Sequence, residues 1–332
     1  MRYCAKQSHV LRPHCSSQSP TVTWRRRPRN RSTANHSKGS RPDTAEKLRT
    51  WADRVRVIFL GVRGSTPAPG EEFLRYGGHT SCVAIAHDGE VPSLLLDAGT
   101  GIRRTSSLLN GEPFRGSILL THLHWDHVHG LPFCDATDRN DSRVTLFIPD
   151  QLDGSEPLEV LSRGMSPPHF PVRADELRGD WSFVSLSSSV MEIEGFHVLV
   201  EEIPHTGGRT YGLRVSDATA AVVYMPDHCP SALGPGPDGL GEYHPAALSL
   251  CEDADVLIHD AQLVREELEA EAYFGHAAAE YAVELARHAN VKQVVLFHHK
   301  QNRVDDDLDA IVARFRENPE VSVATQRTVL EL

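Results

Sequence analysis

A dense group of metal-binding side chains gives this sequence its clearest chemistry: His122, His124, Asp126 and His127. They follow the apolar run 117–120, where we expect a strand to end in a loop. Side chains two residues apart on an extended chain point the same way, so His122 and His124 can bind one metal ion. The turn that follows would direct Asp126 and His127 to a second ion. Imidazole and carboxylate ligands suit zinc, with manganese or iron as alternatives.

Motifs spread along the chain resemble those of the metallo-β-lactamase-fold hydrolases. The family's His-x-His-x-Asp-His signature is matched in full by residues 122–127. The other segments that carry the resemblance are 57–61, 76–82, 96–101, 165–172, 205–208, 223–227, 275–278 and 296–299. The motif around His276 and the closing Phe-His-His segment make the chain most similar to the ribonuclease Z-like and cyclic-phosphodiesterase-like branch of this superfamily.

The resemblance implies a site for two divalent metal ions, completed by residues far along the chain. His205 would join the first two histidines of the signature on one ion, and Asp227 would bridge both ions. The last ligand would join Asp126 and His127 on the second ion. The family's pattern places this ligand at His298, although the neighbouring His299 stays an alternative.

The resemblance also assigns catalytic roles to Asp126 and His276. In this branch, the histidine that corresponds to His276 lies near the scissile phosphate and donates a proton or a hydrogen bond. The alternative is a histidine at a helix start whose ring is satisfied by the backbone. A solvent molecule held between two cations would become a hydroxide nucleophile at neutral pH. We expect Asp97 to hold one ligand histidine in a single tautomer, and Asp260 to be structural or to support the site.

The elements that must position these residues are short apolar strands separated by Gly, Asp and Pro. We expect strands at 55–60, 82–86, 93–96, 117–120, 144–148, 196–202, 212–215, 221–224, 256–258, 293–297 and 322–324. Helices are predicted at 276–289 and 306–317, a flap at 149–180 and an exposed loop at 228–245. The resemblance implies an α/β fold in which two packed sheets have helices outside each, a four-layer αββα sandwich with the metals at one edge.

Charge is distributed unevenly between the two ends of the sequence. Residues 1–50 contain twelve Lys and Arg but two acidic residues, whereas residues 51–332 have 22 basic and 43 acidic residues, a net charge of −21. We expect 1–50 to be a basic disordered tail, which a start codon assigned upstream of the true one would explain, with a transit peptide or a nucleic-acid-binding arm as alternatives. The hydrolase domain is expected at 54–332.

The acidic body favours a small phosphodiester substrate over a nucleic acid, because it repels polyanions. The sequence contains no apolar run of about 18 residues, which is the length that a membrane-spanning helix needs. The six cysteines form no Cys-x-x-Cys pair, which fits reduced thiols in a cytoplasmic protein. A homodimer is one option for the assembly.

Together these features predict a binuclear metal-dependent hydrolase, namely a phosphodiesterase that acts on a small or cyclic phosphodiester through a metal-bridging hydroxide. The alternatives are an RNA endonuclease of the ribonuclease Z type, a hydrolase of lactones, thioesters or β-lactams, and a non-catalytic metal-binding module. Ribonuclease Z enzymes grip tRNA with a basic, glycine-rich arm, whereas the long loops 149–180 and 228–245 are largely neutral or acidic.

Overall fold

Two β-sheets form the centre of this computed structural model, which describes residues 54–318 and 320–332. The tail predicted for residues 1–50 lies outside the described residues. In spatial order, the first sheet consists of β14 (Val329–Glu331), β1 (Val55–Gly61), β2 (Cys82–His87), β3 (Leu94–Leu96), β4 (Arg115–Leu119), β5 (Arg143–Pro149) and β6 (Asp180–Leu186). The second consists of β13 (Val321–Val323), β12 (Gln293–Phe297), β11 (Val256–Asp260), β10 (Ala221–Met225), β9 (Tyr211–Ser216), β8 (Phe196–Glu202) and β7 (Ser189–Ile193).

The inner strands are apolar on both faces because each sheet is covered on both sides there. Val57 and Phe59 of β1 belong to the hydrophobic cluster between the two sheets, together with residues of β8 to β12. Their neighbours Ile58 and Leu60 belong to a different cluster on the outer face of the first sheet. This alternation follows from the two-residue period of a strand.

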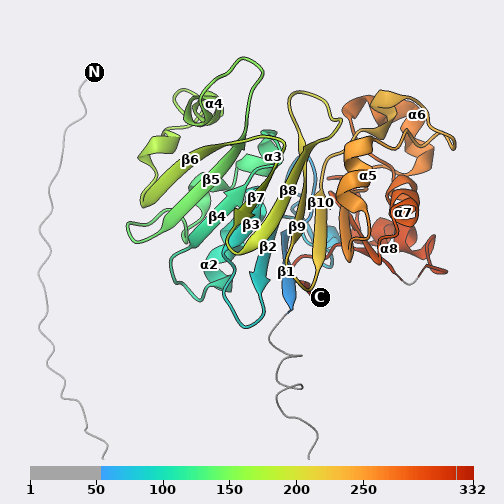
Figure 1. Ribbon diagram of the computed structural model, residues 1–332, viewed down its shortest axis with the longest axis horizontal. Helices are drawn as coiled ribbons and strands as arrows, with labels where there is room; N and C mark the ends of the chain where they lie inside the picture. The colour runs from blue at the N-terminus through green and yellow to red at the C-terminus, as the bar shows by residue number, and fades with distance from the viewer. Residues whose placement is uncertain (1–53, 319) are drawn as a thin grey trace, which may run out of the picture. The chain divides into compact units, whose positions relative to one another are not determined.

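Helices cover the outer face of each sheet (Figure 1). The first sheet carries α2 (Thr105–Leu108), α3 (Trp125–Val128) and α4 (Pro157–Gly164). The second carries α5 (Pro245–Cys251), α7 (Ala279–His288) and α8 (Asp305–Ala313), with the short α6 (Leu268–Glu271) between α5 and α7 along the chain. The predicted four-layer αββα sandwich is therefore confirmed. No helix in the described part of the chain is both long and apolar enough to span a bilayer.

Most strands lie within one or two residues of their predicted positions. The strands predicted at 196–202 and 293–297 are found as β8 and β12 with the same bounds. Three strands were not predicted, namely β6, β7 and β14. All three lie at or beside a sheet edge, where several side chains are exposed and the apolar pattern is weak. The predicted flap at 149–180 contains α4 and leads into β6.

The topology brings several loops to one edge of the sandwich. Strands β10, β11 and β12 run parallel in register, so the loops that follow them emerge side by side. In the first sheet, β4 lies between its parallel neighbours β3 and β5. The backbone N–H of Tyr211 donates to the carbonyl of Thr121 across 2.9 Å, which connects the segment after β4 to the second sheet. The loops after β4, β8, β10 and β12 carry the predicted ligands.

Candidate metal centre

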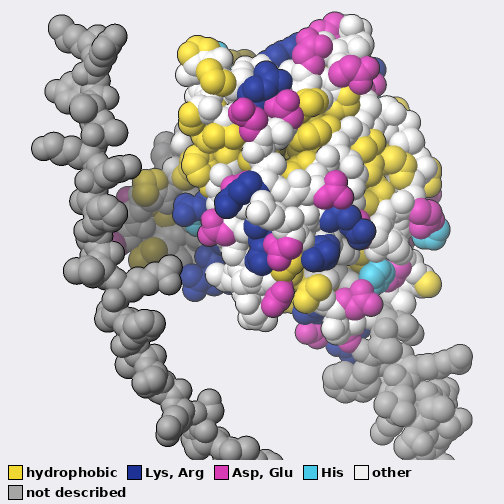
Figure 2. Space-filling model, turned by 90° about the vertical axis from the view of Figure 1, so that its left-hand side faces the viewer, with side chains coloured by type: hydrophobic (Ala, Val, Ile, Leu, Met, Phe, Trp, Pro, Cys, Tyr) yellow, Lys and Arg dark blue, Asp and Glu magenta, His cyan; other side chains and the backbone are white. Residues whose placement is uncertain are grey.

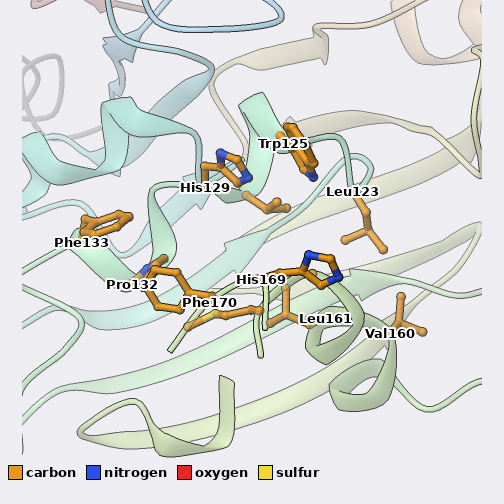
Figure 3. Close-up of a pocket in the computed structure, with 12 residues that line it drawn as sticks. Leu123, Trp125, His129, Pro132, Phe133, Val160, Leu161, His169 and Phe170 are labelled. Carbon is orange, nitrogen blue, oxygen red and sulfur yellow. The ribbon is translucent and has the colours of Figure 1, made fainter. Parts of the chain in front are cut away.

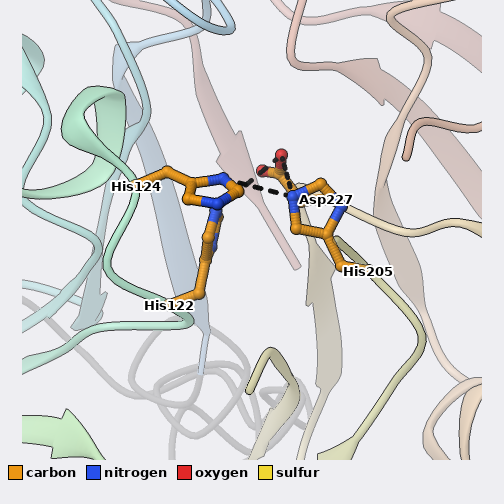
Figure 4. A group of neighbouring side chains, drawn as sticks. All are labelled: His122, His124, His205 and Asp227. Atoms are coloured by element: carbon orange, nitrogen blue, oxygen red, sulfur yellow. Dashed lines mark hydrogen bonds and ion pairs between the residues drawn. The ribbon is translucent and has the colours of Figure 1, made fainter. Parts of the chain in front are cut away.

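Four side chains form a first group at this edge: His122, His124, His205 and Asp227. One potential ligand atom from each lies within 4.8 Å of the others. Figure 4 shows the rings and the carboxylate directed toward one another. The Nε2 atoms of His205 and His122 lie 3.6 and 3.9 Å from Oδ1 of Asp227, and His205 Nε2 lies 3.2 Å from His124 Nδ1. Three imidazoles and one carboxylate are a suitable ligand set for zinc.

A second group lies beside the first and consists of Asp126, His127 and His298. Nε2 of His298 is 3.0 Å from Oδ2 of Asp126 and 3.3 Å from Nε2 of His127. Asp227 connects the two groups, because its other oxygen, Oδ2, lies 2.9 Å from His127 Nε2 and 3.2 Å from His298 Nε2. The structure therefore brings all the predicted ligands together, with one oxygen of Asp227 facing each group.

The charge and burial of these groups fit cations. His122 is buried, and its Nε2 atom has no hydrogen-bond partner. Burial lowers the pKa of His122, His124 and His205, so these rings are neutral and can donate a lone pair to a metal. Although burial alone would lower the pKa of His127, the carboxylates of Asp126, Asp227 and Asp97 raise it well above the usual value. Divalent cations would neutralise the same carboxylates.

Asp97 positions two parts of the metal-binding segment. Its Oδ2 accepts the Nδ1 proton of His127 at 2.7 Å and the hydroxyl proton of Tyr224 at 2.9 Å. Its Oδ1 accepts the backbone N–H of Thr121 at 2.7 Å. Because Nδ1 of His127 carries the proton in this arrangement, Nε2 is free to bind a metal. Asp97 itself has a left-handed backbone, with φ of 59°.

The two adjacent histidines after β12 point in different directions. His298 adopts φ of 59°, and this left-handed conformation directs its ring into the second group. The ring of His299 turns away, and its Nε2 lies 2.8 Å from the carbonyl oxygen of Ala324. The geometry thus favours His298 over His299 as the ligand.

His276 and Asp260 form a buried pair next to the metal-binding groups. Nδ1 of His276 lies 3.0 Å from Oδ2 of Asp260, whose carboxylate also accepts backbone N–H groups of Ala277, His228 and Gln262. Burial lowers the pKa of His276, but the charge of Asp260, reinforced by Asp227 and Asp126, raises it to about 9. His276 lines a cavity of about 370 Å³ together with Asp126, Asp227 and His298. A protonated imidazole therefore faces the space in front of the metal-binding groups.

Two residues at the site were not found by sequence reasoning. The backbone N–H of Ser65, a residue with φ of 63°, donates to Oδ2 of Asp126 at 2.6 Å. The side-chain amide of Gln262 lies 3.1 Å from Nδ1 of His298. Neither residue belongs to a recognisable ligand motif, and the contact of Ser65 is made by its backbone. No signal in the sequence pointed to them.

Comparison with known proteins identifies the family. The beta-lactamase superfamily domain matches residues 93–299, more than half of the chain, so this protein belongs to that superfamily. Ribonuclease Z of Halobacterium salinarum is 27% identical over 278 residues, which cover 74% of this chain and 86% of that protein. The predicted relation to ribonuclease Z-like hydrolases of the metallo-β-lactamase fold is confirmed, and the chain is a hydrolase.

Solved structures show the same fold. The metallo-β-lactamase fold protein YhfI from Bacillus subtilis superimposes with a TM-score of 0.61 at 20% identity, covering 84% of this chain and 100% of YhfI. Human tRNase Z, short form, superimposes with a TM-score of 0.56 at 22% identity, covering 83% of this chain and 98% of the human protein.

The prediction of a small-molecule substrate in place of a nucleic acid is wrong. The relatives are ribonucleases, which act on RNA, and they match this chain over most of their length. The prediction failed because it used the net charge of residues 51–332 as a whole. A bound RNA strand interacts mainly with charged side chains that lie within about one Debye length of it. Charge on this molecule is locally mixed, since Figure 2 shows Lys and Arg side chains interspersed with Asp and Glu.

Proposed function

We propose that this protein is a metal-dependent phosphodiester hydrolase that acts on RNA, with residues 54–332 as the hydrolase domain. The observation that carries the proposal is the arrangement of Asp227, whose two oxygens face two separate groups of histidines, with the His276–Asp260 pair beside them. This arrangement suits two divalent cations, for which we propose zinc. A phosphodiester is the proposed substrate because its departing oxygen needs a proton, and His276 can supply one.

The residues of the site have separate roles in this proposal. When bound, two divalent cations supply a nucleophilic hydroxide and neutralise charge on the phosphoryl oxygens. Asp227 holds the two ligand groups at a fixed separation, and Asp126 is kept in place by the N–H of Ser65. His276 binds Asp260 through Nδ1, which leaves Nε2 as the ring atom available to the substrate. Asp260 thus orients His276 and favours its protonated form.

A cationic cavity supports RNA as the substrate. It measures about 600 Å³, and Arg104 and Arg327 are among the residues that line it, whereas Arg75 at the same cavity is paired with Asp305, Asp306 and Asp309. Burial, and then Arg327, lower the pKa of Arg104, so these two positive charges are close together. This cavity adjoins the residue 64–67 turn that reaches the metal centre at Ser65. Lys and Arg side chains contribute most of the affinity of proteins for nucleic-acid phosphates.

The proposal is tested with zinc-loaded protein of measured metal content. A transcript that contains a tRNA sequence and bis(p-nitrophenyl) phosphate are assayed beside 2′,3′- and 3′,5′-cyclic nucleotides, a lactone and nitrocefin. We expect cleavage of the RNA and the diester, with activity lost in His122→Ala. Turnover of only the lactone or nitrocefin would contradict the proposal, and turnover of only cyclic nucleotides would contradict RNA as the substrate.

Replacement of His276 tests its role as proton donor. We expect His276→Ala to lower kcat on RNA by about 10²–10⁴-fold, the usual effect of removing a general acid. The loss should be much smaller on bis(p-nitrophenyl) phosphate, whose p-nitrophenolate leaves without protonation. An equal loss on both substrates, or a fall in bound zinc, would instead place His276 among the metal ligands. His288→Ala, a change near the end of α7, serves as the control.

A further inference from the structure

An aromatic cavity adjoins the metal centre and has no part in the roles described above (Figure 3). Its volume is about 300 Å³, within the usual range for small-ligand sites. One wall comes from α3 and the residues that follow it, and the other from α4 and the segment after it. The labelled residues that line it are Leu123, Trp125, His129, Pro132, Phe133, Val160, Leu161, His169 and Phe170.

The cavity lies next to the space in front of the metal-binding groups. Leu123 and Trp125 line both cavities. They alternate with the predicted ligands along the chain, because Leu123 lies between His122 and His124 and Trp125 precedes Asp126. A substrate whose phosphate lies at the metal centre would therefore place its neighbouring group in the aromatic cavity.

The exposed rings in the cavity suit a flat aromatic ligand. Trp125 is 70% exposed, although a large aromatic side chain is ordinarily buried. Its ring stacks on His129, with centroids 5.2 Å apart and planes inclined by 21°. Phe133, 55% exposed, follows α3 and makes an edge-to-face contact at 5.7 Å with Phe170, which follows α4. One pair of rings thus lies on the α3 wall, and a second pair connects that wall to the segment after α4.

Polar atoms at the rim distinguish a nucleobase from an alkyl chain. His129 and His169 are both exposed, and each ring can donate or accept a hydrogen bond at its edge. A nucleobase needs both an aromatic surface for stacking and edge groups for hydrogen bonding, whereas an alkyl chain needs neither.

We infer that this aromatic cavity binds a nucleobase of the RNA next to the phosphodiester that is hydrolysed. The inference rests on the proposed function. Trp125 and His129 form the stacking surface, and the contact of Phe133 with Phe170 closes the cavity where its two walls meet. The cavity would favour nucleotides over other phosphate esters but would have little specificity for base sequence, because every base has a face that can stack.

A binding experiment tests the inference independently of turnover. The dissociation constants of adenosine 5′-monophosphate, ribose 5-phosphate and octyl phosphate are measured by calorimetry on the zinc-loaded full-length protein. We expect the nucleotide to bind about 10-fold to 100-fold more tightly than ribose 5-phosphate, the value of one stacked base. Equal affinities, or tighter binding of octyl phosphate, would overturn the inference.

Single substitutions then test whether the aromatic cavity causes the preference for adenosine 5′-monophosphate over ribose 5-phosphate. Phe133→Ala and Trp125→Ala should lose most of the preference for the nucleotide, and Trp125→Phe should keep much of it. Phe133 is the more informative position, because Trp125 lies between two predicted metal ligands. Tyr273→Ala, which removes an exposed aromatic ring outside the cavity, should leave the preference unchanged. A preference retained in both Phe133→Ala and Trp125→Ala would overturn the inference.

Failure of this inference can be separated from failure of the proposed function. If the wild-type protein hydrolyses neither RNA nor bis(p-nitrophenyl) phosphate, the proposed function fails, while the calorimetric comparison still decides whether a base is bound. If it hydrolyses both but binds adenosine 5′-monophosphate no better than ribose 5-phosphate, only the inference fails.

Discussion

At the scale of single residues, Asp97 has a large influence on the metal centre although it belongs to neither ligand group. Its carboxylate accepts protons from Thr121, His127 and Tyr224, so it fixes the start of the metal-binding segment and the tautomer of one ring. An amide in its place would direct an NH₂ group at one or more of these donors and would lack the negative charge that favours a cation.

We therefore expect Asp97→Asn to weaken zinc binding by about 10-fold to 100-fold, the usual effect of losing an outer carboxylate partner. Competition with a chromophoric chelator measures the change. Asp255→Asn is the matched control, because Asp255 also accepts a backbone N–H, from Ala221, but at the start of β10. Equal zinc affinity in the two variants would show that Asp97 does not act through the metal.

The sequence was informative at this scale wherever a side chain belonged to a motif. The ligand histidines and aspartates could be named because their residue types and spacing suggest metal binding. The backbone that directs them could not be predicted, since Ser65, Asp97 and His298 all have positive φ although none is glycine. Such conformations are held by the surrounding structure and leave no local pattern in the sequence.

At the scale of elements, two buried histidines connect β11 to the loop after β10. His259 Nδ1 donates to the carbonyl of Asp260 at 2.7 Å, so its Nε2 is the acceptor for Nδ1–H of His228 at 3.0 Å. Burial lowers the pKa of both rings. Each ring is therefore neutral in the folded protein, where a second proton would have no acceptor in this pair.

Because the buried His228–His259 pair is neutral, we expect the folded protein to lose stability in mild acid. Below pH about 6.5, the unfolded chain protonates His259 while the folded chain does not, so the free energy of unfolding falls as the pH is lowered. We expect the fall to be less steep in His259→Gln, by up to about 1.4 kcal/mol per pH unit. Urea unfolding between pH 5 and 7.5, with chelator present to remove metal effects, measures both slopes.

The exposed His197 on β8 provides the control for this experiment. His197→Gln should retain the wild-type slope, because this side chain is exposed and lies outside the His228–His259 pair. If wild-type protein and His259→Gln gave parallel curves, protonation of His259 would not limit stability in acid.

The elements themselves were predictable where burial is complete. The covered strands β8 and β12 have their expected bounds because continuous or alternating apolar residues mark them. Strand β6 was not predicted, because it lies at the edge of the sheet, where Trp181 and Phe183 are only half-buried and Val184 is exposed. Strand β14 is three residues long, and its pairing with β1 depends on residues at the other end of the chain.

At the scale of the whole molecule, the metal centre joins the two sheets. Asp126 and His127 follow β4 of the first sheet, whereas Asp227 and His298 follow β10 and β12 of the second. Ions bound between these groups would link the sheets at one edge. Because the unfolded chain cannot present this arrangement, metal binding should stabilise the folded state.

We expect removal of zinc by a chelator to lower Tm by on the order of 10 °C, assuming two ions that are each present at about 100 times their dissociation constant. Calorimetry before and after chelation, and after zinc is restored, measures the change. Asp227→Ala should show a much smaller response to the chelator, and His169→Ala the full one. An unchanged wild-type Tm would argue against zinc binding at this site.

The pairing of β1 with β14 has a consequence for how this protein is made on the ribosome. Strand β1, the first strand of the described residues, gains its outer neighbour only from residues 329–331, and the proposed ligand His298 is also synthesised late. A chain released early would lack a ligand, and β1 would have an open edge that favours aggregation. Translation products that stop before His298 would therefore lack a residue of the proposed metal site and be prone to clearance.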